Sequence, residues 1–384
     1  MRVMFPRVSA SFQRYASSAV VQEEIRERLI GFQDWITGIE QRVKKLLQTE
    51  HDLFLFAGTG SGGLESALVN MFSPRDKVVF LVMGEGGKQW AEIADIFCLE
   101  TVRMGVEWGR SIDTQDLDLL LSRGPGKGAK GVCITHNELS TGISTDIEGI
   151  ANVCAQNDIL CLVNAEHSLA AADLQTDKWG GDVVVCALPG GLLIPEGLTF
   201  LSISPKAHEY AHSAASSCCY WSLERALNRM DKDLKKASLY SNAPMLYALE
   251  KALDLAEDEG VQNAFERHKV YSQAIRQGIE AMGLELLVKD QARASPVATA
   301  VMVPEGVNKK KMYDHLGMYG IFTDNSPSRL EGMVFSIVHL GYLDITDISH
   351  ILVVLGLAFR TQGVAVNVEA GLQTVWEVLR YEQN

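Results

Sequence analysis

The chain has 384 residues, of which 47% are hydrophobic, and its formal net charge at pH 7 is −13. Such a chain can bury one large core and a smaller second one, and a net anion is a poor partner for nucleic acid or an anionic membrane surface. Its apolar runs are shorter than the roughly 18 residues that a membrane-spanning helix needs. We therefore expect no nucleic-acid partner and no membrane span.

The N-terminal 22 residues are basic and acid-free. They contain Arg2, Arg7, Arg14 and four serines, and the first acid is Glu23. This pattern fits a mitochondrial transit peptide, but Pro6 interrupts any long amphipathic helix, so we favour an N-terminal arm over residues 1–20. The seven cysteines are scattered and form no C-x-x-C pair, which is typical of reduced thiols inside cells. Together these features predict a cytoplasmic protein, with a mitochondrial location as the alternative.

The central part of the chain alternates helical and strand-like segments. Apolar residues at near-helical spacing predict a helix over 21–47, and the glycine-rich segment 58–63 opens a second helix over 64–71. Strand-like runs follow at 78–83, 131–135, 159–163, 183–187 and 198–203. Because these runs are almost continuously apolar, they predict a parallel sheet covered by helices on both faces.

The C-terminal third has a different organisation. Helices are predicted over 246–257 and 261–282, and a mixed α+β segment starts near Gly283. The chain therefore divides into an arm (1–20), a large α/β domain (21–260), and a helix followed by a small α+β domain (261–384).

One segment of the large domain resembles a known family. From Asp182 to Leu198 a β-branched run ends in a loop that turns on Pro189, Gly190 and Gly191. This segment resembles the cofactor-lysine segment of the class V aminotransferases, the alanine–glyoxylate and serine–pyruvate group. Five more motifs match that family in order: AGTGSGGLESAL (57–68), THNELSTG (135–142), LVNAEHSL (162–169), PMLYALEKAL (244–253) and VFSIVHLG (334–341).

The resemblance implies the fold type I architecture of pyridoxal-phosphate-dependent transferases. This is a large α/β domain with a mostly parallel seven-stranded sheet and a smaller C-terminal α+β domain. It also implies a homodimer, in which the arm packs across the partner subunit. The apolar residues for such an interface would be Phe32, Trp35, Ile36, Leu246 and Tyr247.

The resemblance also predicts that the usual chemistry is lost. Counted from Asp182, or back from Gly197, the position of the lysine that binds pyridoxal phosphate falls on Gly190, which has no amine. Asn164 stands at the position of the aspartate that pairs with the pyridine nitrogen. Ser336 stands at the position of the arginine that binds the substrate carboxylate. Conventional transamination is therefore not expected, and no covalent cofactor is predicted.

The glycine turn retains a feature that can bind an anion. Thr59, Gly60 and Ser61 match the segment that holds the cofactor phosphate in the family. Hydroxyls and free N–H groups at a helix N-terminus attract anions independently of that resemblance. The alternative is that these residues form an ordinary strand-to-helix turn that binds no ligand. The turn thus leaves room for a non-covalent pyridoxal or pyridoxamine phosphate, or for another small anionic or phosphorylated ligand.

A different set of reactive groups follows the strand ends. Glu166 and His167 come after one strand, His136 after another, and Cys186 just before the turn at Gly190. Because the carboxyl ends of parallel strands meet in one crevice, these residues are candidates for acid–base or nucleophilic chemistry. Glu166 and His167 are predicted to be adjacent on a strand, so their side chains point to opposite faces and only one of them can face the crevice. Ligand spacing for a metal is absent, so no metal site is expected.

Three interpretations follow, and they leave open whether the protein is an enzyme. In the first, the protein is a pseudo-aminotransferase that acts without pyridoxal phosphate as a structural or regulatory partner. In the second, the scaffold catalyses another reaction on a small anionic or phosphorylated ligand. In the third, it is a divergent aminotransferase or lyase that uses a non-covalent cofactor on a small amino acid or 2-oxo acid.

Overall fold

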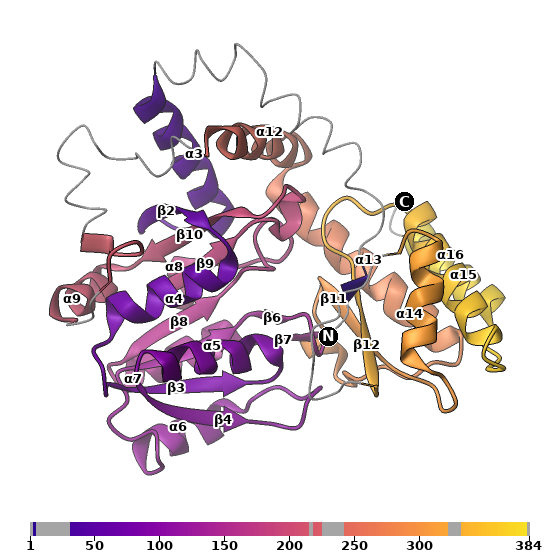
Figure 1. Ribbon diagram of the computed structural model, residues 1–384, viewed down its shortest axis with the longest axis horizontal. Coiled ribbons are helices and arrows are strands. Elements are labelled where there is room, and N and C mark those ends of the chain that lie inside the picture. Colours follow the sequence, from indigo (N-terminus) through magenta and orange to yellow (C-terminus); the bar gives the residue numbers. More distant parts are fainter. Residues whose placement is uncertain (1–2, 5–30, 215–217, 225–241, 322–331, 382–384) are drawn as a thin grey trace.

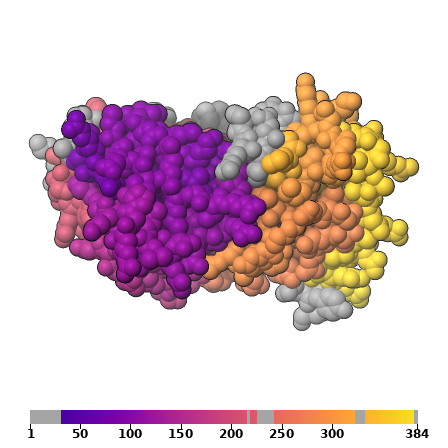
Figure 2. Space-filling view, turned by 90° about the horizontal axis from the view of Figure 1, so that it is seen from below, coloured from indigo at the N-terminus to yellow at the C-terminus, as the bar shows by residue number. Residues whose placement is uncertain are grey.

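The computed structural model describes residues 3–4, 31–214, 218–224, 242–321 and 332–381. They form a larger α/β domain and a smaller α+β domain (Figure 1). Figure 2 shows the two domains side by side, the first in indigo to magenta and the second in orange and yellow. Among the described helices, none is long and apolar enough to cross a membrane.

The large domain is built on a seven-stranded sheet. Its spatial order is β2 (Asp52–Gly58), β10 (Gly197–Ile203), β9 (Val183–Ala187), β8 (Leu160–Asn164), β5 (Gly131–Thr135), β3 (Lys77–Val82) and β4 (Glu100–Gly105). Only β10 runs against its neighbours, pairing antiparallel with β2 and β9. The expected mostly parallel seven-stranded sheet is therefore confirmed. The two edge strands, β2 and β4, were not predicted, because β4 is largely solvent-accessible and lacks a continuous apolar run.

Helices cover both faces of this sheet. They are α3 (Phe32–Leu47), α4 (Gly60–Met71), α5 (Glu85–Ile96), α6 (Thr114–Ser122), α7 (Ile147–Gln156), α8 (Thr176–Trp179) and α9 (Pro205–Ser213). Alternate residues of β3 enter opposite cores: Val79 and Leu81 pack on one side, Val78 and Phe80 on the other. Burial on both faces explains why the strands are apolar at successive positions rather than at every second one.

Two helices connect the domains. They are α12 (Ala243–Glu259) and α13 (Val261–Ala281). The small domain then contains η2 (Gln291–Arg293), β11 (Ala298–Met302), α14 (Lys309–Met318), β12 (Val334–Val338), α15 (Ile345–Arg360) and α16 (Val368–Tyr381). Near the N-terminus, β1 (Val3–Met4) pairs parallel with β12 of the same chain, and β11 pairs antiparallel with β12 on its other side. The remainder of the predicted arm lies outside the described residues.

Helix α4 begins at Gly60, earlier than the predicted start at residue 64. Close packing explains why glycines continue into its first turn. A Cβ atom added at Gly63 would lie 2.7 Å from Val185 Cγ1 and would overlap Thr199 Oγ1. The absence of a side chain at Gly63 therefore lets the N-terminus of α4 lie directly on strands β9 and β10.

Three of the five residues predicted at a two-fold interface are buried inside a single chain. Phe32 and Ile36 of α3 and Leu246 of α12 belong to the large-domain core. Helices α3 and α12 contact each other, as Figure 1 also shows. The prediction that these three side chains are available to a partner subunit is therefore wrong, because α3 and α12 bury them against each other and the core. Trp35 and Tyr247 are half-buried.

Candidate functional site

The loop after β9 carries Gly190 at its most constrained point. Gly190 opens the short helix η1 (Gly190–Leu192), and its φ of +48° is in the left-handed region. A Cβ atom at this position would lie 3.1 Å from both Cβ and O of Leu169. A side chain added here would thus meet the turn that follows β8. Glycine is the residue that this backbone accommodates without strain.

The turn after β8 holds two of the predicted site residues. Strand β8 ends at Asn164, and residues 166–171 form turns. The premise that Glu166 and His167 alternate along a strand is therefore wrong. Asn164 is buried, and its Oδ1 accepts a hydrogen bond of 3.1 Å from the Glu166 backbone N–H. The Asn164 amide oxygen thus stabilises this turn.

The side chain of Glu166 lies against the N-terminus of α4. A Cβ atom added at Gly60 would overlap the Glu166 carboxyl group, which therefore sits directly over the first residue of the helix. The N-terminus of a helix carries partial positive charge and attracts a carboxylate. Thr59 is the N-cap residue of α4, and the Ser61 hydroxyl accepts a hydrogen bond of 3.1 Å from Gln89 Nε2. The carboxyl group of Glu166 thus lies beside Gly60, within the Thr59–Ser61 segment.

A tryptophan that the sequence did not single out covers the same glycine turn. Cβ atoms added at Gly58 and Gly62 would both overlap the Trp221 ring. That ring packs edge-on against Phe56 at a centroid distance of 5.6 Å. The Trp221 carbonyl also accepts a hydrogen bond of 2.8 Å from Asn70 Nδ2. Trp221 is therefore held over the glycine turn by contacts from both its ring and its backbone, and no sequence motif indicates this long-range contact.

A second carboxylate lies at the N-terminus of α5. Glu138 accepts hydrogen bonds from the backbone N–H groups of Gly86 (3.0 Å) and Gly87 (2.8 Å). Burial raises the pKa of the Glu138 carboxyl, while these two hydrogen bonds act in the opposite direction. A Cβ atom at Gly86 would lie 3.1 Å from Glu138 Oε2. The carboxylate and the glycine thus fit together closely at this helix end.

Ser336 connects the two domains. It lies on β12 and is fully buried, and its hydroxyl donates a hydrogen bond of 3.3 Å to the Ser140 carbonyl in the large domain. Leu139 joins an apolar cluster between the domains with Val338 and Leu340. The Ser336 hydroxyl therefore stabilises the contact between the two domains.

The four candidates for redirected chemistry do not meet in one place. Cys186 is buried near Glu166, and its Sγ donates to the Ala165 carbonyl at 3.5 Å. Burial, and next the charge of Glu166, raise the pKa of the Cys186 thiol well above its usual range, which disfavours a nucleophilic thiolate. His167 is half-buried and makes no hydrogen bond through its side chain to any described residue. His136 lines a separate cleft that Glu166, His167 and Cys186 do not line.

The expected convergence on one crevice is therefore wrong for His136, because its ring lies on the side of the sheet that faces α8. Within the described ranges, no group of three or more His, Cys, Asp or Glu side chains is placed to hold a metal ion.

Comparisons with known proteins define the family. The sequence model of the aminotransferase class-V family matches residues 3–325, so the chain belongs to that family. It is similar to the small subunit of a soluble hydrogenase from Synechococcus sp., with 34% identity over 80% of this chain and 79% of the relative. It is also 31% identical to an uncharacterised aminotransferase of Methanocaldococcus jannaschii, over 89% of this chain and 88% of the relative.

A solved structure shows the same fold. Ureidoglycine–glyoxylate aminotransferase from Bacillus subtilis matches with a TM-score of 0.87 and 23% identity, over 98% of this chain and 97% of that one. The fold type I architecture implied by the sequence is confirmed. The family is dependent on pyridoxal phosphate, so the residues at the matching positions decide whether this chain can hold that cofactor.

Proposed function

We propose that this chain is a member of the class V aminotransferase family that works without lysine-bound pyridoxal phosphate, as a structural or regulatory subunit rather than a transaminase. The position of Glu166 carries this proposal. Its carboxyl group lies over Gly60 at the N-terminus of α4, where the family resemblance places the cofactor phosphate. The residues at this site do not fit the cofactor in the arrangement that the family implies.

Electrostatics supports this reading. Two unit negative charges 4 Å apart repel by about 4 kcal/mol at the effective dielectric of a protein surface. A phosphate group at the N-terminus of α4 would approach the Glu166 carboxylate at least as closely, because that carboxylate already contacts Gly60. Binding of a phosphate there would therefore require the Glu166 side chain to move. The same argument weighs against a small anionic or phosphorylated ligand at Thr59–Ser61.

The other matched positions support the same conclusion. Gly190 has no amine, and its left-handed backbone directs any added side chain toward Leu169. Asn164 is neutral and uses its amide oxygen on the Glu166 backbone. Ser336 uses its hydroxyl on Ser140. Covalent attachment, ring protonation and substrate binding would each lack their usual side chain.

A subunit role agrees with the naming of one relative. The Synechococcus protein is named as the small subunit of a soluble hydrogenase. We also propose a homodimer, because the family resemblance places the degenerate site at a two-fold interface. Sedimentation of the purified chain at micromolar concentration should give a dimer. A well-folded monomer would contradict the homodimer.

Equilibrium dialysis against pyridoxal phosphate tests the proposal. We expect the wild-type chain to retain no stoichiometric cofactor, whereas the double variant Glu166→Ser with Trp221→Ala should bind it, because both obstacles are removed. Glu65→Gln, which removes an acid further along α4, should behave as wild type. Stoichiometric binding by the wild type would instead favour the alternative of a divergent aminotransferase or lyase with non-covalent pyridoxal or pyridoxamine phosphate.

A further inference from the structure

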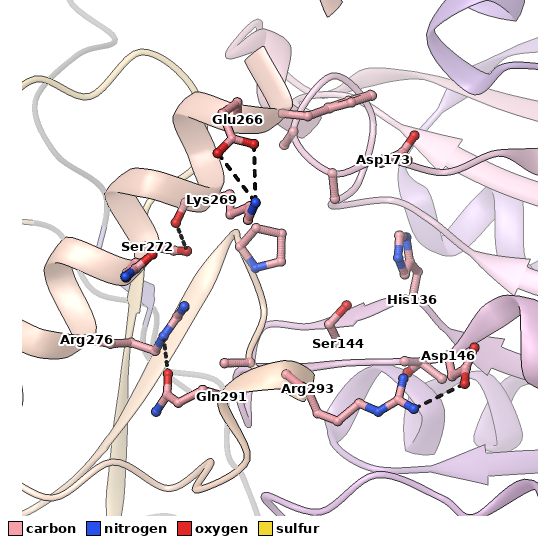
Figure 3. Close-up of a pocket in the computed structure, with 18 of the residues that line it drawn as sticks. His136, Ser144, Asp146, Asp173, Glu266, Lys269, Ser272, Arg276, Gln291 and Arg293 are labelled. Atoms are coloured by element: carbon pink, nitrogen blue, oxygen red, sulfur yellow. Dashed lines mark hydrogen bonds and ion pairs between the residues drawn. The ribbon is translucent and has the colours of Figure 1, made fainter. Parts of the chain in front are cut away.

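A cleft of about 890 Å³ lies between the two domains, away from Gly190. One wall is formed by the large domain around His136, Ser144 and Asp173, and the other by α13 and η2 (Figure 3). The volume falls within the range of small-molecule sites in proteins. The chemistry of the side chains on the large-domain wall indicates what this cleft binds.

The imidazole of His136 has one nitrogen that a ligand in the cleft can reach. The side chain is 4% exposed, and Nδ1 is closed to solvent without a hydrogen-bond partner among the described residues. Nε2 is not among these closed atoms and makes no hydrogen bond to a described residue, so it is the nitrogen that can face the cleft. Burial lowers the pKa of His136 to about 4, so that the ring is neutral at pH 7. A neutral imidazole has one nitrogen without a proton, which accepts a hydrogen bond when the proton is on the other nitrogen.

Asp173 places a negative charge beside this ring. Its charge acts on His136, raising the pKa against the effect of burial. The two carboxylate oxygens accept hydrogen bonds from the amide groups of Gln48 (2.5 Å) and Gln175 (2.8 Å). Among the described residues, these hydrogen-bond partners of Asp173 are uncharged. Trp179 adds an aromatic ring, with its centroid 6.1 Å from that of His136.

Two of the three cations on the opposite wall are held in ion pairs, and the third, Arg276, donates to neutral oxygens. Lys269 pairs with Glu266 at 3.4 Å, and Arg293 pairs with Asp146 at 3.1 Å. Arg276 lies across the cleft from His136, and its guanidinium donates to Gln291 Oε1 at 2.9 Å (Figure 3). The lining as a whole contains five acids (Asp146, Glu148, Asp173, Glu266 and Glu280) and three bases (Lys269, Arg276 and Arg293). The cleft is therefore net negative.

We propose that this cleft binds an aliphatic diamine or polyamine. One primary ammonium group donates a hydrogen bond to Nε2 of His136, lies beside Asp173 and contacts the Trp179 ring. A neutral imidazole, a carboxylate and an aromatic ring are the groups that recognise an ammonium ion. Glu148 lines the same cleft and offers a second charged position, whereas the charge of Glu280 acts on Arg276. The formal charge of −13 adds a long-range attraction for cations.

Isothermal titration of the purified chain with 1,4-diaminobutane tests this proposal, with butane-1,4-diol and succinate as neutral and anionic probes of similar length. The diamine should bind with one-to-one stoichiometry, whereas the diol and the dicarboxylate should give no saturable heat. Absence of diamine binding would overturn the proposal. Equal binding of succinate would overturn it as well, because an anion cannot use Asp173.

Variants locate the site. Asp173→Asn retains the shape of the side chain but removes its charge, and it should weaken diamine binding about tenfold or more, the size of one charge-assisted hydrogen bond. His136→Phe removes the acceptor nitrogen and should weaken binding similarly, which provides an independent variant if Asp173→Asn folds poorly. Asp116→Asn changes an acid on α6 outside the cleft and should bind as wild type. Equal losses of diamine affinity in all three variants would contradict the proposed location of the site, because position in the cleft would then make no difference.

Discussion

The crevice at Gly190 and the cleft at His136 differ in how their polar groups are satisfied. In the crevice, the Asn164 oxygen accepts from the Glu166 backbone, Glu166 lies at the N-terminus of α4, and Glu138 accepts from two amides of α5. In the cleft, His136 has no hydrogen-bond partner for its ring nitrogens among the described residues, and Asp173 has only uncharged partners there. The polar groups near Gly190 are thus bonded within the chain, whereas those of the cleft, which we propose as a binding site, have fewer partners.

Acid sensitivity is the largest effect expected from the buried imidazoles. Burial is the main cause that lowers the pKa of His136 and His268 to about 4 and that of His339 to about 3. The unfolded chain therefore binds more protons than the folded one between these values and about 6.5. Stability should be full above pH 6.5 and fall as the pH is lowered, by about 2 kcal/mol per histidine at pH 5.

Urea unfolding at pH 7.5 and pH 5 measures this loss. Glu138 has a raised pKa and therefore favours the folded state at lower pH. This single group opposes the three histidines, so a net loss of stability is expected. The variant His136→Phe should lose less stability between the two pH values than the wild type. Unchanged stability from pH 7.5 to 5 in the wild type would show that the histidines are not held neutral.

Removal of Trp221 should produce the next largest effect. The ring covers Gly58 and Gly62 and packs against Phe56. Because the ring is only partly buried, Trp221→Ala should cost about 2 kcal/mol, below the 3–5 kcal/mol of a fully buried tryptophan. Thermal or urea denaturation measures the change. A loss below a few tenths of a kcal/mol would indicate that Trp221 does not close the crevice.

The variant Gly190→Lys tests whether the missing amine is the only defect. A lysine at φ +48° is strained and meets Leu169, so we expect a loss of about 1–2 kcal/mol in the free energy of unfolding. Alanine–glyoxylate transamination with added pyridoxal phosphate should remain absent, because Asn164, Glu166 and Ser336 are unchanged. Rapid turnover by this single variant would show that the rest of the site is intact.

The smallest effect is expected from Glu166→Gln. A carboxylate close to the N-terminus of a helix contributes about 0.3–1 kcal/mol through the partial positive charge there. Glutamine retains the shape of the Glu166 side chain but not its charge. Denaturation at low ionic strength should reveal this difference, and added salt should diminish it. If the difference persisted unchanged in high salt, the contribution of Glu166 would be packing rather than charge.

Much of the fold could be predicted from the sequence, and less of the site. Strands β5, β8 and β9 are short runs of mostly apolar residues, and such continuous runs indicate strands that are buried on both faces of a parallel sheet. The edge strand β4 has no such signal, because its exposed positions carry polar side chains. The assignment of the lysine position to Gly190 depends on the spacing within one continuous segment and stays a prediction. The overlap of Glu166 with Gly60, and the cover that Trp221 provides, depend on turns and long-range packing that local patterns do not encode.

Borohydride reduction in the presence of pyridoxal phosphate, followed by peptide mass spectrometry, tests the central claim most directly. A lysine-bearing member of the family treated alongside should give a stoichiometric phosphopyridoxyl adduct on its site lysine. The sequence motif predicts Gly190 at the matching position of the present chain, so we expect no stoichiometric adduct at any lysine of the crevice. A stoichiometric adduct on a single crevice lysine would contradict the account, because the cofactor would then both enter the site and find an amine there.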